Sequence, residues 1–314
     1  MARFNRLRTG YAVGISALLT LSSTLCGQDT RLKEFMERPF DLRPEYGVGD
    51  TDFYHIRTVY LEMNDSGEVA HTRVLDGYYS REMVRIESGK RYDRFVWKYV
   101  RQGHRQGKGE MNEYTILPFT KDFRYELSVD DWQPSHFPVD LSLIPKTMEG
   151  WLFVVKLIDA HTFDVIANTD AYRGKLERVG DTALMPADGI PVVMDFPPLF
   201  TDTHFTNAPF YTTFYGVTLY GGEPCGILAF RADDNRLRMV VNVMDMKLPT
   251  DAVSYYWGDV LVSLETGRIA SARIRERVDS ITQAFIHVGA PMRQVVLREI
   301  TMERLEPEEY EQVE

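Results

Sequence analysis

The sequence is short of cysteine, of positive charge and of recognisable catalytic motifs. Its 314 residues contain two cysteines, Cys26 and Cys225, and 36 Lys and Arg against 46 Asp and Glu. So few cysteines exclude a small disulfide-stapled scaffold, and a chain of this length can bury enough apolar surface to fold without a metal or crosslink. The excess of acid disfavours general nucleic-acid binding, which depends on neutralising phosphates with Lys and Arg.

The common catalytic signatures are also missing. The chain contains no G-x-S-x-G, H-E-x-x-H, P-loop, G-x-G-x-x-G, paired C-x-x-C or EF-hand sequence. These absences speak against the common hydrolases and nucleotide-dependent enzymes, and we expect no cofactor and no metal. A site assembled from residues scattered along the chain stays open.

Aromatic residues make up 12% of the chain, and together with β-branched residues they favour strands. Strand-like runs joined by short Gly- and Asp-containing connections, such as 232–235, favour antiparallel meanders. The segment 148–161 is apolar at helical spacing and on most of its surface, which favours a buried helix. We therefore predict a mainly β (α+β) fold of antiparallel β-meander sheets, curved or half-barrel in shape, with one buried helix near 146–160. Whether the strands form one sheet or two stays open.

Composition divides the chain into six segments. They are a signal peptide (1–27), a linker (28–50), an N-terminal antiparallel β region (51–132), a Pro-rich segment with the central helix (133–190), a C-terminal antiparallel β-meander (191–305) and an acidic tail (306–314) that we expect to be solvated.

The first 27 residues have the layout of an export signal. A basic start precedes an apolar stretch from Tyr11 to Leu25, which is shorter than a membrane-spanning helix needs and is followed by small residues. We expect the mature chain to have no transmembrane span and to be periplasmic, secreted or lipid-anchored at the cell envelope. Cys26 is a lipidation candidate, although Leu25 before it is unusual for that processing. Cys225, the other cysteine, is expected to be buried.

Three residues are candidates for acid–base chemistry. Asp159 and His161 lie near the end of the predicted helix, where a carboxylate can orient an imidazole as a general base. The alternative is that His161 only caps the helix. Glu276 falls on the apolar face of a predicted strand, where a carboxylate needs a partner or a raised pKa. Its alternative is a salt bridge to an Arg on a neighbouring strand.

A second set of residues is suited to binding. The segment 81–108 carries nine Lys and Arg against three acids, with aromatic residues among them, and is suited to an anionic partner or the acidic tail. The alternative is the solvated face of a hairpin. Asp202, His204 and His161 lack the spacing of a metal site. The candidate ligand-binding residues are Glu276, Trp257, Tyr256, Trp97 and Arg94.

The sequence thus favours an exported, non-enzymatic β-rich protein. It would bind an apolar or amphiphilic ligand in a curved sheet, or an envelope component. The expected partners are a lipid, a small apolar molecule or an envelope protein, and not nucleic acid. The alternatives are a secreted hydrolase with a dispersed Asp/Glu/His site and a purely structural envelope protein.

Overall fold

The computed structural model describes most of the chain that follows the predicted signal peptide. It covers residues 32–33, 35–128, 139–168, 175–185, 191–244, 246–283 and 291–313. The predicted signal peptide at 1–27, including Cys26, lies outside these ranges. Within them, no helix combines the length and apolarity needed to cross a membrane.

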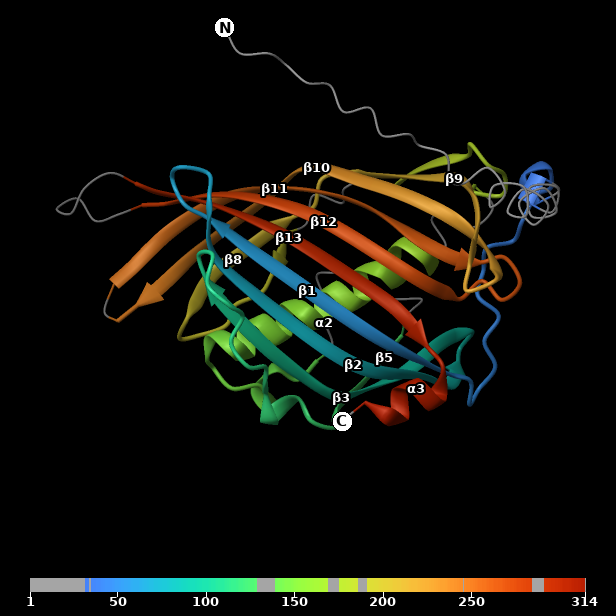
Figure 1. The fold of residues 1–314 in the computed structure, drawn as a ribbon, viewed down its shortest axis with the longest axis horizontal. Coiled ribbons are helices and arrows are strands. Elements are labelled where there is room, and N and C mark those ends of the chain that lie inside the picture. The colour runs from blue at the N-terminus through green and yellow to red at the C-terminus, as the bar shows by residue number, and fades with distance from the viewer. Residues whose placement is uncertain are drawn as a thin grey trace, which may run out of the picture.

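The described strands form one antiparallel sheet that curves around a long helix, α2 (Figure 1). The neighbours along the sheet are β4-β3-β2-β1-β13-β12-β11-β10-β8-β7, with β5 paired to β3, β9 to β10 and β6 to β9. The strands are β1 (Thr51–Met63), β2 (Val69–Glu87), β3 (Lys90–Gln106), β4 (Thr115–Ile116), β5 (Phe123–Ser128), β6 (Thr182–Met185), β7 (Val192–Val193), β8 (Phe200–Thr206), β9 (Phe210–Tyr220), β10 (Glu223–Val243), β11 (Met246–Ser263), β12 (Ile269–Thr282) and β13 (Met292–Leu305). The helical elements are the 3-10 turns η1 (Pro118–Thr120) and η2 (Leu141–Leu143) and the helices α2 (Met148–Asn168) and α3 (Pro307–Gln312).

One ladder joins the N-terminal and C-terminal parts of the chain. β1 pairs with β13 from Phe53–Leu305 to Met63–Val295, so the two predicted β regions form a single sheet. The prediction of a mainly β, antiparallel and curved architecture is confirmed. The question of one sheet or two, which the sequence left open, is settled by this long-range pairing.

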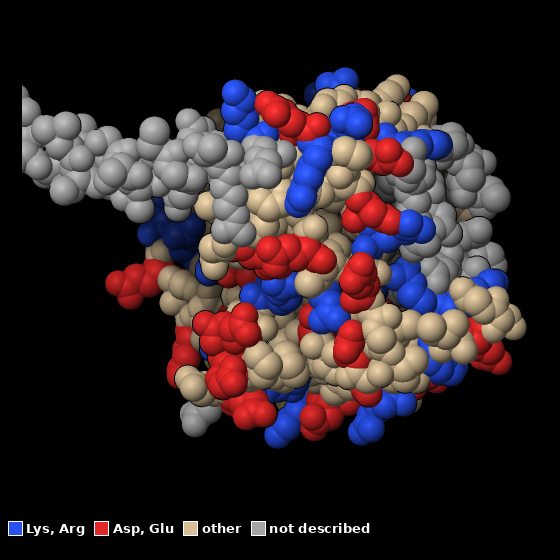
Figure 2. Space-filling model, turned by 90° about the vertical axis from the view of Figure 1, so that its right-hand side faces the viewer, with Lys and Arg blue, Asp and Glu red and all other residues tan. Residues whose placement is uncertain are grey.

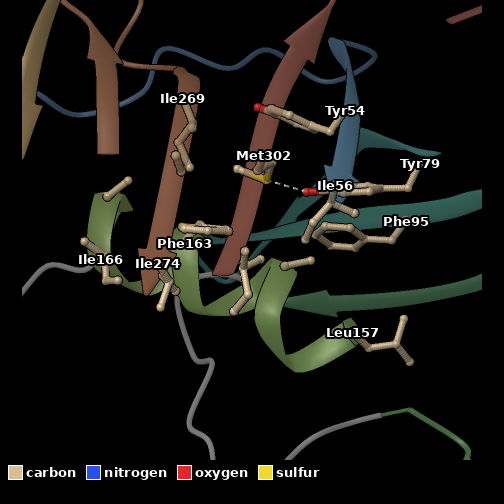
Figure 3. Close-up of a cluster of buried hydrophobic side chains, with 14 of the residues drawn as sticks. Tyr54, Ile56, Tyr79, Phe95, Leu157, Phe163, Ile166, Ile269, Ile274 and Met302 are labelled. Carbon is tan, nitrogen blue, oxygen red and sulfur yellow. Dashed lines mark hydrogen bonds between the residues drawn. The ribbon is translucent and has the colours of Figure 1, made fainter. Parts of the chain in front are cut away.

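The predicted buried helix is present and extends further than expected, from Met148 to Asn168. Thr147 precedes it and supports the first turn, because its hydroxyl accepts a hydrogen bond from the Gly150 amide at 3.3 Å. Apolar residues of α2, among them Leu157, Phe163 and Ile166, belong to the buried core, and Figure 3 shows Phe163 on the side of the helix that faces the strands of Ile274 and Met302. We call the sheet face that contacts α2 the inner face and the opposite face the outer face.

Two long strands contain positions with unusual packing or register. β2 runs through Gly77, where a side chain would come within 3.0 Å of both Trp97 and Val100. β10 runs through 232–235, where a bulge shifts the register. The predicted connection there is wrong, because the bulge turns Asn235 inward and its side-chain amide donates to the Ser254 carbonyl at 3.1 Å.

The acidic tail is helical over residues Pro307–Gln312, and all of these except Tyr310 are exposed. These form α3, whose first turn has a capping box between Glu306 and Glu309. The Lys98 ammonium donates hydrogen bonds to the Tyr310 carbonyl at 2.8 Å and to the Glu311 carbonyl at 3.1 Å. One cation of the basic segment therefore contacts the protein's own tail, one of the partners considered for that segment.

Candidate functional site

A cluster of charged and polar side chains lies between α2 and the inner face of the sheet. β1, β11, β12 and β13 supply its sheet side, and α2 supplies two residues one turn apart. We call this set the inner polar cluster: Tyr60, Lys156, Asp159, Ser254, Glu276 and Arg298.

Arg298 is the centre of the cluster. Its guanidinium donates to Asp159 at 2.5 Å and lies 3.1 Å from a Glu276 oxygen, so one arginine binds a carboxylate of the helix and a carboxylate of the neighbouring strand. The Ser254 hydroxyl donates to the second Glu276 oxygen at 2.6 Å. The Tyr60 ring lies beside the guanidinium, 5.4 Å from its central carbon.

Lys156 lies one turn before Asp159 and is completely buried. Its ammonium donates to the Leu75 carbonyl at 3.1 Å and to the Thr58 hydroxyl at 3.3 Å. Burial lowers the pKa of Lys156 to about 7, although Asp159 acts in the opposite direction. This lysine is therefore held near the point of losing its charge at neutral pH.

Burial also perturbs the other groups of the cluster. It raises the pKa of Asp159, against the effect of Arg298 and Lys156. Burial alone would lower the pKa of Arg298, but the carboxylates of Asp159 and Glu276 raise it by more, so the pKa of Arg298 is raised. Burial raises the pKa of Tyr60 as well. Arg298 therefore stays charged at neutral pH.

Three buried atoms of the cluster have no hydrogen-bond partner among the described residues. They are the Tyr60 hydroxyl, one carboxylate oxygen of Asp159 and the Nε of Arg298. A buried polar group left in this way costs about 1–3 kcal/mol. A molecule that reaches the cluster and both donates and accepts hydrogen bonds would recover part of this cost.

The inner face continues past the cluster as a half-buried apolar surface. Along β12 and β13, burial falls steadily away from α2: Ile274 and Ile300 are buried, Val278 and Val296 are half-buried, and Met292 is exposed. We call the half-buried apolar residues of this surface the inner strip: Leu237, Met239, Val241, Leu248, Val278 and Val296. Their pairing partners place all of them on the inner face.

The structure brings two of the three predicted acid–base residues together. Asp159 and Glu276 share Arg298, and for Glu276 this is the salt bridge to a neighbouring strand that the sequence offered as an alternative. His161 is elsewhere: its ring nitrogen is 2.8 Å from the Tyr125 hydroxyl, and its ring meets Phe95 edge-on at 4.7 Å. These positions make His161 part of the aromatic packing under the helix.

The predicted ligand-binding residues do not form one site. Trp97 lies in the core against Phe153, Trp257 is 47% exposed on the outer face, and Arg94 pairs with Glu126 at 2.9 Å on the surface. Tyr256 is opposite Glu276 in the β11–β12 ladder and shares the inner face with it. Only Tyr256 and Glu276 of this set thus adjoin the inner polar cluster.

Sequence reasoning missed Arg298, Lys156, Tyr60 and Ser254. Lys156 had a readable signal, because it is the one charged residue within the apolar run WLFVVKLI at 151–158. A lone lysine in a helix that is apolar all round must find buried acceptors. The other three become recognisable only when the strand pairing is known.

Several other charged groups pair with neighbouring side chains. In the basic segment, Arg81 forms a buried ion pair with Asp93, and Arg101 lies 2.8 Å from Asp76. Figure 2 shows acidic and basic side chains interleaved on the face it presents. His204 and Asp202 are 2.9 Å apart, but the described residues contain no group of three metal-ligating side chains.

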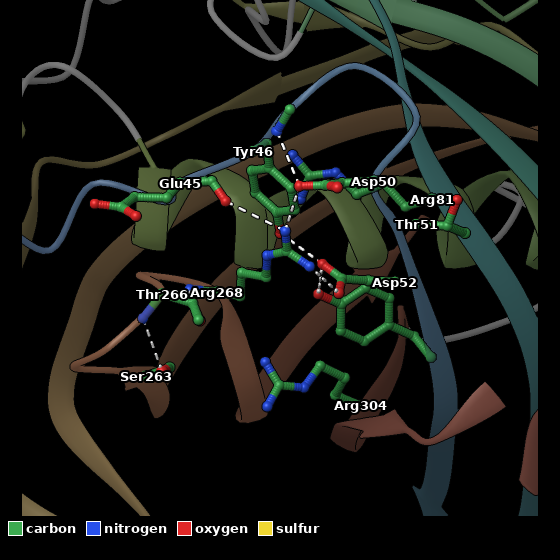
Figure 4. A network of polar contacts seen from close by, with 12 residues as sticks. Glu45, Tyr46, Asp50, Thr51, Asp52, Arg81, Ser263, Thr266, Arg268 and Arg304 are labelled. Atoms are coloured by element: carbon green, nitrogen blue, oxygen red, sulfur yellow. Dashed lines mark hydrogen bonds and ion pairs between the residues drawn. The ribbon is translucent and has the colours of Figure 1, made fainter.

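A second polar network, shown in Figure 4, holds the segment before β1. Arg268 lies 2.6 Å from Asp50 and 3.3 Å from Asp52, and it donates to the Glu45 carbonyl at 3.2 Å. The Tyr46 hydroxyl donates to Asp52 at 2.7 Å. These contacts fasten residues 45–52 to the turn between β11 and β12, which is a structural role.

An open groove of about 600 Å³ crosses β8, β10, β11 and β12. The charged residues that line the groove alternate along their strands with residues that face α2. Because successive side chains of a strand point to opposite faces, the groove lies on the outer face. Arg238 and Asp251 lie 4.0 Å apart there, and both are mostly exposed. A ligand held inside the curve of the sheet, as the sequence suggests, would lie on the opposite face, so this groove is not that site. Its lining includes His204, Arg236, Arg238, Asp251, Asp279 and Ile281.

Comparisons with known proteins do not identify the chain. No protein family and no curated protein matches it. Among solved structures, Salmonella typhi OmpF in complex with daunomycin is 7% identical over 82% of this chain and 99% of its own, with a TM-score of 0.20. A DUF1329 family protein from Desulfovibrio piger is 9% identical over 84% of this chain and 90% of its own, with a TM-score of 0.17. At these TM-scores neither similarity supports an argument about this protein.

Proposed function

We propose that this is an exported, non-enzymatic binding protein that holds an amphiphilic molecule on the inner face of its C-terminal strands. The apolar part of the ligand lies along the inner strip, and its polar head meets the inner polar cluster. The observation that carries the proposal is the meeting of two features: an apolar surface that is only half-buried ends at buried polar atoms without partners.

The charges of the cluster indicate the kind of head group. The cations Lys156 and Arg298 face the carboxylates Asp159 and Glu276, and Lys156 can lose its charge near neutral pH, so the cluster has no excess of positive charge that would favour an anionic head group. The partnerless atoms include an acceptor, a donor and a hydroxyl that can do both. A neutral head with hydroxyl groups, as in a monoacylglycerol, satisfies all three.

The contacts support binding better than catalysis. Ser254, the hydroxyl of the cluster, donates its proton to Glu276, and the cluster contains no histidine that would activate it. The carboxylates Asp159 and Glu276 both bind Arg298. The export part of the proposal rests on the layout of residues 1–27, and mass spectrometry of the mature N-terminus tests it, including acylation at Cys26.

The binding test uses 1-oleoylglycerol as the probe and Tyr60→Phe as the main variant. Because the Tyr60 hydroxyl is buried and has no partner among the described residues, its loss should not destabilise the protein and should raise the stability by up to about 1–3 kcal/mol. It should weaken 1-oleoylglycerol binding about fivefold, the effect of one hydrogen bond of about 1 kcal/mol. Tyr54→Phe, on the same strand and face, is the matched control and should bind as the wild type does.

A second variant tests the apolar part of the ligand. Val296→Ser on the inner strip should weaken binding of 1-oleoylglycerol, whereas Val59→Ser on the outer face of β1 should not. Native mass spectrometry of gently purified protein should show a co-purified amphiphile. If the wild type carries nothing after several gentle purifications and does not bind 1-oleoylglycerol, the proposal is wrong and the cluster serves only to join helix and sheet.

A further inference from the structure

Exposed apolar side chains gather at one end of the sheet. At the left of Figure 1 the hairpins β10–β11 and β12–β13 project past α2. Met244 in the first turn is 94% exposed, and Met292 at the start of β13 is 58% exposed. Large apolar side chains are seldom so exposed in a group unless they meet a partner. We call this group the apolar end: Val243, Met244, Met246, Ile281 and Met292.

Strand pairing brings the two hairpins side by side. β11 pairs with β12 up to Thr250–Thr282, and the Gln283 amide donates to the Pro249 carbonyl at 2.9 Å. Val243 pairs with Met246 to close the first hairpin beyond that point. The members of the apolar end therefore belong to one continuous structure, although they are far apart in the sequence.

The apolar end has exposed apolar side chains on both faces of the sheet and at the turn. Val243, Met246 and Met292 lie on the inner face, Ile281 lies on the outer face and Met244 is at the turn. A flat protein partner would cover one of these faces and leave the other in water. A lipid bilayer surrounds an inserted tip on all sides, so this arrangement fits a bilayer better than a protein surface.

The cations at this end are placed for lipid phosphates. Lys247 follows Met246, Arg293 follows Met292, and both cations are exposed. The whole chain is acidic, with a formal net charge of −10, but at physiological salt charges beyond about 8 Å are largely screened. The acids of this region have basic neighbours: Asp251, opposite Ile281, lies 4.0 Å from Arg238, and Asp279 lies 2.8 Å from Arg277. Lys247 and Arg293 are the cations that lie next to the methionines of the apolar end.

We infer that the apolar end docks on the surface of a lipid bilayer. Met244 and its neighbours enter the apolar layer, and Lys247 and Arg293 meet the phosphate groups above it. This inference does not rest on the proposed function, because it concerns the outside of the projecting hairpins and holds whether or not a ligand binds on the inner face.

The test is sedimentation with vesicles of phosphatidylcholine alone and of phosphatidylcholine with phosphatidylglycerol. The exported protein carries Cys26→Ser, so that no acyl chain can bring it to the lipid. It should sediment with both kinds of vesicle, and more strongly with the anionic kind. Met244→Ser should lower the partition coefficient about tenfold, because one methionine leaves the apolar layer. Lys247→Glu should lower binding to the anionic vesicles about fivefold.

Tyr215→Ser is the matched control, since Tyr215 is also highly exposed but lies on β9, outside the projecting hairpins. It should bind vesicles as the wild type does. A Met244→Trp variant reports insertion directly, because its fluorescence should shift to shorter wavelength when vesicles are added. The inference is overturned if the wild type binds neither kind of vesicle, or if Met244→Ser has the same partition coefficient as the wild type. It is equally overturned if sedimentation velocity shows a dimer that Met244→Ser dissociates, because a second copy would then cover the end.

Discussion

Replacing Arg298 by methionine should destabilise the protein strongly. The side chains of Arg298 and Asp159 are only 15% and 7% exposed, and Glu276 is 11% exposed, so water cannot take over the lost contacts. Removing one partner of such a buried pair typically costs about 3–5 kcal/mol, because it leaves uncompensated charge in a medium of low polarity. Since Arg298 binds two carboxylates, the upper half of that range is expected.

The loss should depend on pH in a defined direction. Burial already raises the pKa of Asp159, and Arg298 is the first of the groups that oppose this rise. Without Arg298 the folded variant binds a proton at Asp159 more readily than the unfolded chain does, so its stability falls as pH rises. Lowering the pH from 7 towards 4 should therefore return part of the lost stability to the variant relative to the wild type.

Urea unfolding followed by circular dichroism at several pH values measures both effects. Arg275→Met is the matched control, because Arg275 is half-exposed on the adjacent strand and lies 3.6 Å from Glu299; it should cost less than about 1 kcal/mol. Adding Asp159→Asn and Glu276→Gln to Arg298→Met should recover most of the stability. A loss below 1 kcal/mol for Arg298→Met, or a pH profile parallel to that of the wild type, would refute this account of the cluster.

Three further predictions concern single residues. Because the pKa of Lys156 is lowered to about 7, the folded protein binds fewer protons than the unfolded chain above that pH. The stability of the wild type should therefore rise from pH 7 towards pH 10. Urea titrations at several pH values should show that Lys156→Met lacks this rise. Gly77→Ala should lower the free energy of unfolding, measured by urea titration, by about 1–3 kcal/mol, because the new methyl group lies 3.0 Å from Trp97 and from Val100. Gly216→Ala is the control and should not lower it, because the space around Gly216 is open. Cys225 is buried and its pKa is raised to about 12, so it should react with a thiol reagent only after unfolding, and fast labelling of the native protein would contradict its packing role.

The sequence predicted the elements of the fold better than their connections. Alternation and turn residues were enough for the antiparallel strands, and apolar spacing was enough for α2. The pairing of β1 with β13 could not be predicted, because no local pattern links residues so far apart. The bulge at 232–235 was read as a turn, because Asp and Asn are typical of both and only the inward position of Asn235 separates them.

The candidate site was predictable in part. The position of Glu276 among apolar residues left two interpretations open, and the structure shows the alternative, a salt bridge to an arginine on the next strand. The sequence could not identify Arg298 as this arginine, because that depends on the register of β12 against β13. It could not show that Asp159 shares Arg298 either, because that depends on the placement of α2. The pairing of His161 with Tyr125 could not be read from the sequence either, because Tyr125 lies on β5, at a distance along the chain.

The ladder between the first and last long strands has a consequence for biogenesis. Until β13 has left the ribosome, β1 lacks one of its two neighbours, and the sheet that encloses α2 cannot be completed. A polypeptide of this topology acquires its native state late, after synthesis is nearly finished. That delay is compatible with the export that we propose, since a translocation channel threads chains that have not yet folded.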